Sequence, residues 1–348
     1  MDNKRFFKEA GYGMMVHFGL YSLLGGEYRG KKSSAYAEWI GSYFGIPEKE
    51  YEQLAKVFNP IYFDAEEWVR FARDCGMKYI VITTKHHEGF ALFRSACDPY
   101  NICDASPFGR DLIAELADAC RKYGLRLGFY YSQDLDWHEK HGGGYLSRHI
   151  PCAGVSWDNS WDWNDVSDKD FSVCFEKKIL PQVTELMTNY GDVLLTWFDV
   201  PMTINAEQSR RLYETVKKYQ PDCLVNSRIG NGTYDYVSLG DNEIPADKEA
   251  WERISRADPA DTDYQSIHGF KPSPWGLYES ACTLNDSWGF SYRDHNWKSP
   301  EQLYRNRKHL NDLGINYLIN VGPDPLGRIP GEAQDILRRA AELAQGDK

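Results

Sequence analysis

Residues 65–84, AEEWVRFARDCGMKYIVITT, combine a helix pattern, a glycine and a strand pattern in that order. In the first eleven residues the apolar side chains recur at the spacing of one helix face, and Gly76 follows as a helix-terminating residue. Residues 78–84 are an apolar run of the length of a buried strand. This order of elements predicts a strand that pairs in parallel with others of its kind.

The same order returns along the chain. We expect further strands at 12–19, 126–132, 192–199, 223–227 and 316–321, further helices at 110–123, 175–189 and 206–219, and a final helix at 331–345. Gly124, Gly191 and Gly314 stand where a helix stops and the next strand starts. Six strands are visible, whereas a closed barrel of this type has eight. We therefore predict an α/β fold, a (β/α)8-type, TIM-like barrel in which some helices are irregular or missing.

The length of 348 residues fits one such barrel, because these barrels reach ~250 residues or more as one domain. We expect residues 1–348 to form a single domain, since the final helix leaves nothing for a second one. The stretches 138–170 and 230–286 are rich in Gly, Ser, Asp, Asn and Trp, and we expect both to be long functional loops.

The net charge of −11 argues against a nucleic-acid partner, because that binding needs clustered Lys and Arg. No stretch approaches ~18 consecutive apolar residues, so we expect no membrane partner. The N-terminus, MDNKRFFKEAGYG, lacks the apolar core of a signal peptide, which predicts a cytoplasmic protein, or a secreted or periplasmic one if a signal peptide has been removed. The eight cysteines include no CxxC pair, which favours free thiols. No pattern indicates the oligomeric state.

Polar and aromatic residues follow nearly every predicted strand. In a parallel barrel the carboxyl ends of the strands meet at one face, and active sites lie there. This face would supply what a sugar ligand needs: hydrogen-bond donors and acceptors for its hydroxyls, aromatic rings for its apolar face, and a carboxylate for the acetal carbon. The residues concerned are His17, Lys85, His86, His87, Tyr131, Trp197, Asp199 and Arg228.

Two of these residues have structural alternatives. Asp199 precedes Val200 and Pro201, and an Asp before an early proline is also the pattern of a helix N-cap. Arg228 would serve equally in a structural ion pair. The convergence of several strand ends favours the functional interpretation for both.

A metal site at His86 and His87 is a further alternative, and it would make the chain a metal-dependent barrel hydrolase. Metal ligands need a third and a fourth partner at a defined spacing. His138 and His141 lie nearby in sequence, but no carboxylate or cysteine pattern links them to His86. We therefore expect neither a metal nor a cofactor.

Five segments together resemble the glycoside hydrolase family 29 α-L-fucosidases. KYIVITTKHHEGFALFRS, residues 78–95, is similar to that family's Lys-His-His-Asp-Gly-Phe signature. MMVHFGLYS, RLGFYYSQDLDW, LLTWFD and INYLINVGPDPLGRIP agree with further family segments in the same order. The match runs from about Phe6 to Ile329. The resemblance implies a retaining α-L-fucosidase that removes terminal fucose from a fucosylated oligosaccharide or glycoconjugate.

Carried over residue by residue, the resemblance implies that Asp199 is the nucleophile of a double displacement. It places Arg228 near that carboxylate, where a positive charge keeps it ionised. It leaves two candidates for the acid/base, Glu243 in DYVSLGDNEIP and Glu279 in WGLYESACTLNDSWGF, of which Glu243 is preferred. The remaining residues implied to bind the sugar are His17, Glu38, Trp39, His86, His87, Tyr131 and Trp197, with Trp288 and Phe290 of the SWGF segment near its methyl group.

The sequence departs from the family pattern at three positions. Val200 stands where a glycine usually follows the nucleophile, Phe18 where His-Trp-Gly is common, and Glu88 where the signature has Asp. None of these changes removes a reacting group. The β-sandwich domain that often follows the barrel in this family is not expected here.

Two functional alternatives stay open at this stage. One is a retaining glycosidase of the same fold that acts on another sugar such as galactose, and the other is a non-catalytic fucose-binding protein. The sequence does not distinguish (1,2), (1,3)/(1,4) and (1,6) linkages, nor hydrolysis from transfucosylation.

Overall fold

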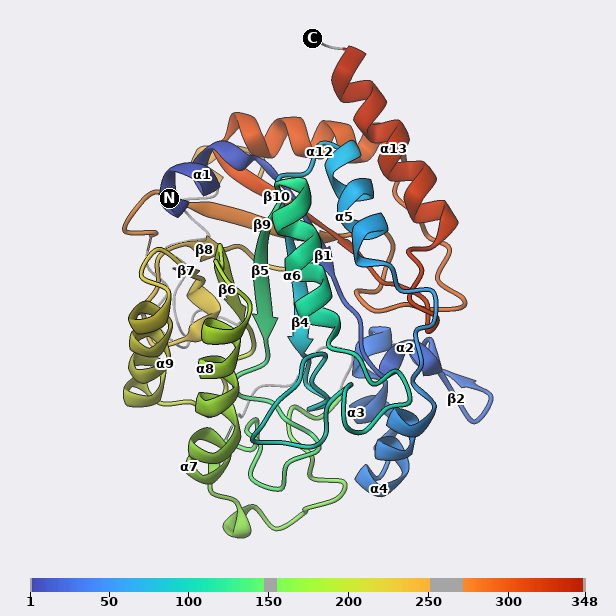
Figure 1. The fold of residues 1–348 in the computed structure, drawn as a ribbon, viewed down its shortest axis with the longest axis vertical. Coiled ribbons are helices and arrows are strands. Elements are labelled where there is room, and N and C mark those ends of the chain that lie inside the picture. Colours follow the sequence, from blue (N-terminus) through green and yellow to red (C-terminus); the bar gives the residue numbers. More distant parts are fainter. Residues whose placement is uncertain (1, 147–154, 251–271, 347–348) are drawn as a thin grey trace.

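The chain folds around a single curled sheet of eight parallel strands (Figure 1). A computed structural model describes residues 2–146, 155–250 and 272–346. The strand order is β7-β6-β5-β4-β1-β10-β9-β8, and a parallel bridge between Asn226 and Tyr236 links the two end strands. The predicted TIM-like barrel is therefore confirmed.

The barrel strands are short, and most of them are separated by helices. The strands are β1 Tyr12–Val16, β4 Tyr79–Lys85, β5 Arg126–Tyr131, β6 Leu195–Phe198, β7 Leu224–Val225, β8 Val237–Ser238, β9 Tyr278–Thr283 and β10 Ile315–Val321. The main helices are α1 Asn3–Ala10, α5 Ala65–Asp74, α6 Leu112–Tyr123, α7 Phe171–Cys174, α8 Leu180–Asn189, α9 Ala206–Tyr219, α12 Pro300–Asp312 and α13 Gly331–Gly346.

Shorter elements decorate the barrel. The segment between β1 and α5 holds α2 Tyr21–Leu24, the hairpin β2 Glu27–Tyr28 and β3 Lys31–Lys32, the 3-10 helix Ala37–Trp39, α3 Ile40–Phe44, α4 Glu48–Tyr51 and the 3-10 helix Glu52–Val57. Further short helices are Phe175–Ile179, a π-helix that joins α7 to α8, and the 3-10 helices Val166–Asp168 and Ser227–Ile229.

Six strands lie where the sequence predicts them, but the expectation of one long loop at 230–286 is wrong. Strands β8 and β9 both lie inside that stretch. Strand β8 has only two residues, and β9 reads YESACT, so neither is an apolar run. The predictions also lacked α12. Residues 147–154 and 251–271 of the two expected loops lie outside the described residues.

Helix ends follow the predicted chemistry. Gly76, Gly124, Gly191 and Gly314 all have positive φ, between 76° and 82°, which a glycine adopts without strain at a helix C-terminus. At the start of α9, Asn205 forms a capping box with Gln208. The glycines mark where helices end, and the capping box marks where α9 begins.

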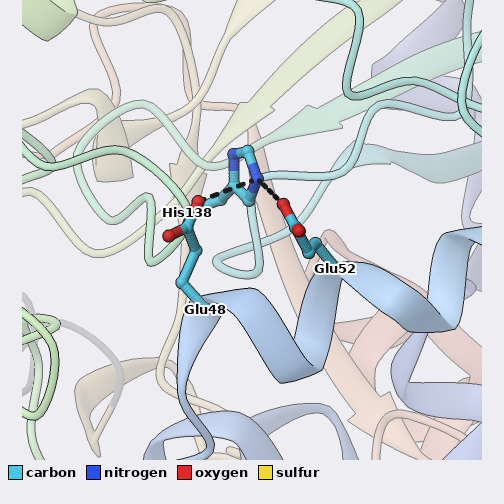
Figure 2. Close-up of side chains that lie close together, drawn as sticks. All are labelled: Glu48, Glu52 and His138. Carbon is cyan, nitrogen blue, oxygen red and sulfur yellow. Dashed lines mark ion pairs between the residues drawn. The ribbon is translucent and has the colours of Figure 1, made fainter.

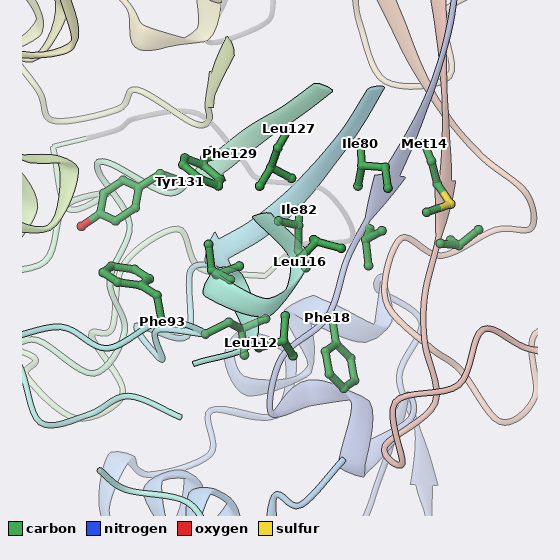
Figure 3. Packing of buried hydrophobic residues seen from close by; sticks show 14 of the residues in the cluster. Met14, Phe18, Ile80, Ile82, Phe93, Leu112, Leu116, Leu127, Phe129 and Tyr131 are labelled. Atoms are coloured by element: carbon green, nitrogen blue, oxygen red, sulfur yellow. The ribbon is translucent and has the colours of Figure 1, made fainter. Parts of the chain in front are cut away.

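Successive strand residues point to opposite sides of the sheet, and both sides are buried. Met14, Ile80 and Leu127 belong to the outer layer between the sheet and the helices (Figure 3). Met15 and Val81 belong to the layer that fills the barrel interior. A shift of one residue along a strand therefore moves a side chain from the interior to the helix layer.

The carboxyl ends of β4 and β5 point toward the region where α2, α3, α4 and long loops gather (Figure 1). That region is where a barrel of this type carries its active site. Within the described ranges, no helix has the length and apolar character needed to cross a membrane. The seven described cysteines are free thiols, as predicted, and Cys152 lies outside the described residues.

Gly13 offers a test of the packed interior. A Cβ at this position would lie 2.5 Å from the Tyr79 ring. We expect Gly13→Ala to lower the free energy of unfolding by about 1–3 kcal/mol, because the ring has to move within a filled core. Urea denaturation measures this, with Gly331→Ala as the control, since its Cβ would meet nothing within 4 Å. Equal stability of the two variants would contradict the packing.

Candidate active site

Asp199 directly follows β6, and the strands on both sides fix the backbone there. The Gln133 side chain, just after β5, accepts a hydrogen bond from the Asp199 N–H at 2.8 Å and donates to the Arg228 carbonyl at 2.9 Å. Asn226, just after β7, accepts from the Phe198 N–H and donates to the Phe198 carbonyl, both at 2.9 Å. Three side-chain hydrogen bonds thus fix the backbone of Phe198 and Asp199, and a fourth ties Gln133 to Arg228.

The Asp199 carboxylate has a donor on each oxygen. The Tyr130 hydroxyl donates to Oδ2 at 2.8 Å, and Nη1 of Arg228 donates to Oδ1 at 3.0 Å. Nε2 of His87 lies 3.9 Å from Oδ2. Burial raises the pKa of Asp199 to about 6, Arg228 and Tyr130 oppose that rise, and the charge of Asp241 adds to it. The group is therefore a carboxylate at neutral pH.

Arg228 joins Asp199 to a second carboxylate, that of Asp241. Its Nη2 donates to Asp241 Oδ1 at 2.6 Å and to the Leu239 carbonyl at 2.9 Å. The Asp241 side chain is 38% exposed, against 12% for Asp199. Asp241 is not among the predicted site residues, because β8 has only two residues and no apolar run marks it in the sequence. The signal that points to Asp241 is an acid just past a strand end.

Three buried histidines lie beside Asp199. Nδ1 of His17 is 2.7 Å from Asn320 Oδ1, and Nδ1 of His87 is 2.7 Å from Ser132 Oγ. The His86 ring lies between them, 5.6 Å from His17 and 4.1 Å from His87. Burial lowers the pKa of His17 to about 4 and those of His86 and His87 well below the usual range. Neutral imidazoles can both donate to and accept from sugar hydroxyls.

The 3-10 helix Ala37–Trp39 brings Glu38 and Trp39 to the same place. Glu38 accepts a hydrogen bond from the Gly289 N–H at 2.8 Å, and burial raises its pKa to about 8. The Trp39 ring meets His87 edge-on at 4.9 Å. A protonated Glu38 can donate to a sugar oxygen, so this segment offers a donor and an aromatic face together.

Aromatic rings complete the site. Tyr130 stacks on Trp197 at 5.5 Å and meets His17 at 5.4 Å, while Trp288 lies 5.2 Å from His17. The Arg228 guanidinium lies over the Trp197 ring at 4.5 Å. Most of the predicted residues are therefore close to Asp199 or to one another, namely His17, Glu38, Trp39, His86, His87, Trp197, Arg228 and Trp288.

The prediction of Tyr131 as a sugar-binding residue is wrong. Its side chain lies in the outer layer, and its hydroxyl donates to Gln182 Oε1 of α8 at 2.8 Å. Tyr130, one residue earlier, faces the interior and contacts Asp199. The sequence run RLGFYYS contains two adjacent tyrosines, and only the strand register decides which of them faces the site.

The described contacts of Phe290 do not include Asp199. Its ring packs against Tyr292 at 4.9 Å, and it lines a surface groove shared with Tyr62 and Arg328. The SWGF segment therefore contributes Trp288 to the site, whereas Phe290 packs on the neighbouring groove.

The two predicted acid/base residues have different environments. Glu279 is fully buried on β9, where Oε2 accepts from the Tyr79 hydroxyl at 2.6 Å and Oε1 from Trp197 Nε1 at 2.9 Å. Burial raises the pKa of Glu279 to about 7. Glu243 follows β8, and its Oε2 accepts from the Gly240 N–H at 2.7 Å. Glu279 has the raised pKa of an acid, but protein donors occupy both of its oxygens.

The site histidines do not form a metal centre with other described residues. Within the described ranges, the one group of three ligand-bearing side chains close enough to share an ion is Glu48, Glu52 and His138. His86 and His87 are not part of it.

Comparisons with known proteins agree with this geometry. A family model described as alpha-L-fucosidase matches residues 1–345. The tissue alpha-L-fucosidase of Rattus norvegicus is 39% identical, over 98% of this chain and 68% of its own length.

The chain belongs to the α-L-fucosidase family.

Relatives differ in how much of their length the chain covers. It spans 52% of alpha-L-fucosidase 1 of Arabidopsis thaliana, at 26% identity. By contrast, it covers 98% of the solved α-L-fucosidase AlfC of Lactobacillus casei, at 58% identity and a TM-score of 0.91. Structures of AlfC include complexes with the α-L-fucose product, with 4-nitrophenyl-α-L-fucopyranoside and with Fucα(1,6)GlcNAc, and two variants described as fucosyltransferase mutants.

Val200 gives a physical reason for the glycine that usually follows the nucleophile in α-L-fucosidases. Its φ is 51°, in the left-handed region that a β-branched residue rarely adopts. The side chain is buried in a cluster with Trp39, Trp137 and Met202. Packing holds this strained residue directly next to Asp199.

Tyr130 and Tyr131 form a matched pair for testing the fucosidase site. We expect kcat/KM of the wild type to fall below about pH 6, because Asp199, with a pKa of about 6, loses its negative charge there. Tyr130→Phe removes a hydrogen bond that lowers this pKa, so the acidic limb moves to higher pH and kcat/KM falls about 10-fold. The pH profile on a nitrophenyl fucoside measures both effects.

Tyr131→Phe is the control for that experiment. It loses only the bond to Gln182 on the outer side of the sheet. The variant should keep the wild-type pH profile and lose about 1 kcal/mol of stability. A shifted profile in Tyr131→Phe together with an unchanged one in Tyr130→Phe would reverse the assignment of the two faces.

Proposed function

We propose that this chain is a retaining α-L-fucosidase in which Asp199 is the nucleophile. The observation that carries the proposal is the environment of the Asp199 carboxylate. The group is ionised at neutral pH, and Arg228 and Tyr130 each donate a hydrogen bond to it. It lies at a strand end beside neutral histidines. In the first step Asp199 attacks the anomeric carbon and the bond to the leaving oxygen breaks. In the second, water attacks that carbon, the bond between the carbon and Asp199 breaks, the acid/base takes a proton from the water, and fucose leaves with retained configuration.

The residues around Asp199 suit this chemistry. Neutral His17, His86 and His87 supply hydrogen bonds without adding charge that would compete for the nucleophile. Arg228 stabilises the carboxylate before attack and again when it leaves. Trp197 and Trp288 offer the apolar faces that a deoxy sugar with a methyl group requires.

For the acid/base we propose Asp241 in preference to Glu243 and Glu279. One guanidinium holds both Asp199 and Asp241, which is compatible with the ~5 Å separation that retaining enzymes use. Asp241 is the more exposed of the two acids, as a residue that meets both a leaving group and water must be. Glu279 remains buried under Trp197, and we assign it a structural role there.

As the substrate we propose α-1,6-linked fucose on N-acetylglucosamine. The support is the similarity to AlfC, which at 56% identity and a TM-score of 0.90 has been captured with Fucα(1,6)GlcNAc. Next to the site, Trp39 meets Trp137 at 5.3 Å and Trp157 at 5.4 Å, and these rings offer stacking surfaces for the second sugar.

Replacing the nucleophile tests the mechanism. We expect Asp199→Gly to lower kcat on 4-nitrophenyl α-L-fucoside by about 1000-fold or more, because the covalent step is lost. Added azide should partly restore turnover by entering the space of the missing carboxylate. Near-normal activity of this variant would refute the assignment.

Two controls on the wild type accompany that measurement. Activity that survives a strong chelator excludes the metal-dependent hydrolase. Cleavage of the matching galactoside but not of the fucoside would favour the alternative sugar, and binding of fucose without turnover would favour a non-catalytic protein.

The acid/base is identified by its dependence on the leaving group. Nitrophenolate leaves without a proton, whereas N-acetylglucosamine needs one. We expect Asp241→Ala to lower kcat/KM far more on Fucα(1,6)GlcNAc than on the nitrophenyl fucoside, and Glu243→Gln and Glu279→Gln to affect both substrates equally. If Glu243→Gln or Glu279→Gln shows the selective loss instead, that residue is the acid.

A further inference from the structure

Two carboxylates and one imidazole converge beside the loop that follows β5. Glu48 opens α4 and Glu52 opens the next 3-10 helix, so the two are four residues apart and share a face. His138 approaches from the β5 loop and points between them (Figure 2). Its Nε2 lies 3.3 Å from Glu48 Oε1 and 3.8 Å from Glu52 Oε2.

The spacing of these atoms fits a shared ion. All three ligand atoms lie within 4.8 Å of one another. At metal–ligand distances of ~2.0–2.2 Å, neighbouring ligands around a tetrahedral Zn²⁺ are about 3.4 Å apart. The 3.3 Å and 3.8 Å separations between the His138 Nε2 and the two carboxylates are close to this ligand–ligand spacing.

The surroundings orient the histidine and leave room for a further ligand. The His138 ring stacks on Tyr100 at 3.7 Å and an interplanar angle of 12°, which fixes its direction. A cavity of about 20 Å³, lined in part by Glu48, Tyr51 and His138, lies beside the group. That volume holds one water molecule.

We propose that Glu48, Glu52 and His138 bind one divalent cation of the zinc class, with water as the fourth ligand. Zn²⁺ binds both imidazole nitrogen and carboxylate oxygen, whereas Ca²⁺ and Mg²⁺ prefer oxygen ligands alone. No sequence pattern links these glutamates to His138, because they are about 90 residues apart.

The ion has a structural role next to the sugar site. Trp137, which precedes His138, donates its N–H to the His87 carbonyl at 2.7 Å, and its ring lies 5.6 Å from His87 and 5.3 Å from Trp39. A cation would tie this loop to the α4 segment and so fix one wall of the site. It takes no part in bond cleavage, and the site does not depend on the proposed function.

Calorimetric titration of the metal-stripped protein with ZnCl₂ tests the proposal. We expect one Zn²⁺ per chain, and a rise of a few degrees in Tm at hundredfold excess of the ion over Kd. Glu52→Gln and His138→Ala should each weaken binding about 10-fold or more. A zinc anomalous-scattering peak between the three side chains in wild-type crystals would locate the ion without any variant.

Glu67→Gln is the matched control, because it removes a carboxylate from the first turn of another helix. It should bind Zn²⁺ as the wild type does. Absence of binding by the wild type, equal affinity of Glu52→Gln and wild type, or binding of Ca²⁺ but not Zn²⁺ would each overturn the proposal. Hydrolysis of the nitrophenyl fucoside by the stripped protein is expected to continue, so this result is separable from the test of Asp199.

Discussion

The buried ion pair between Arg228 and Asp199 is the interaction on which the site depends. Burial alone favours a protonated, unreactive Asp199, and the guanidinium opposes this. Arg228 is itself only 2% exposed, so it needs partners on more than one side. The Leu239 carbonyl and Asp241 supply them, and both follow β8. The ion pair therefore links the ends of β6, β7 and β8, the part of the barrel where the strands are shortest.

Neutral neighbours allow this pair to function. Burial keeps His17, His86 and His87 uncharged, and Glu38 shares the same buried surroundings with a raised pKa. A protonated imidazole beside Asp199 would compete with Arg228 for the carboxylate. Burial thus raises the pKa of Asp199, and it also lowers the pKa values of the three histidines so that they carry no competing positive charge. The buried histidines and Glu38 around Arg228 and its two carboxylates are therefore neutral hydrogen-bonding groups.

Sequence patterns identified the features that are local in the chain. The β6 run and its terminal Asp199 stand out because an apolar strand ends on an acid. Periodicity does not distinguish Tyr130 from Tyr131, because both faces of that strand are buried. No pattern marks Asp241, because β8 is two residues long and is held by its neighbours rather than by its own apolar pattern. Pairing with β9 and the bridge to Asn226 define that strand, and both are tertiary contacts.

The lysine of the Lys-His-His signature has a role in the scaffold. Nζ of Lys85 lies 3.0 Å from Asp136 Oδ2, and Nζ of Lys178, from the π-helix before α8, lies 2.9 Å from the same oxygen. All three side chains are buried, so the two ammonium groups hold the pKa of Asp136 well below its usual range. Asp136 immediately precedes Trp137, whose N–H binds the His87 carbonyl. The lysine of the signature therefore anchors the loop that packs against the histidines, and its presence in the motif follows from positioning rather than from contact with the substrate.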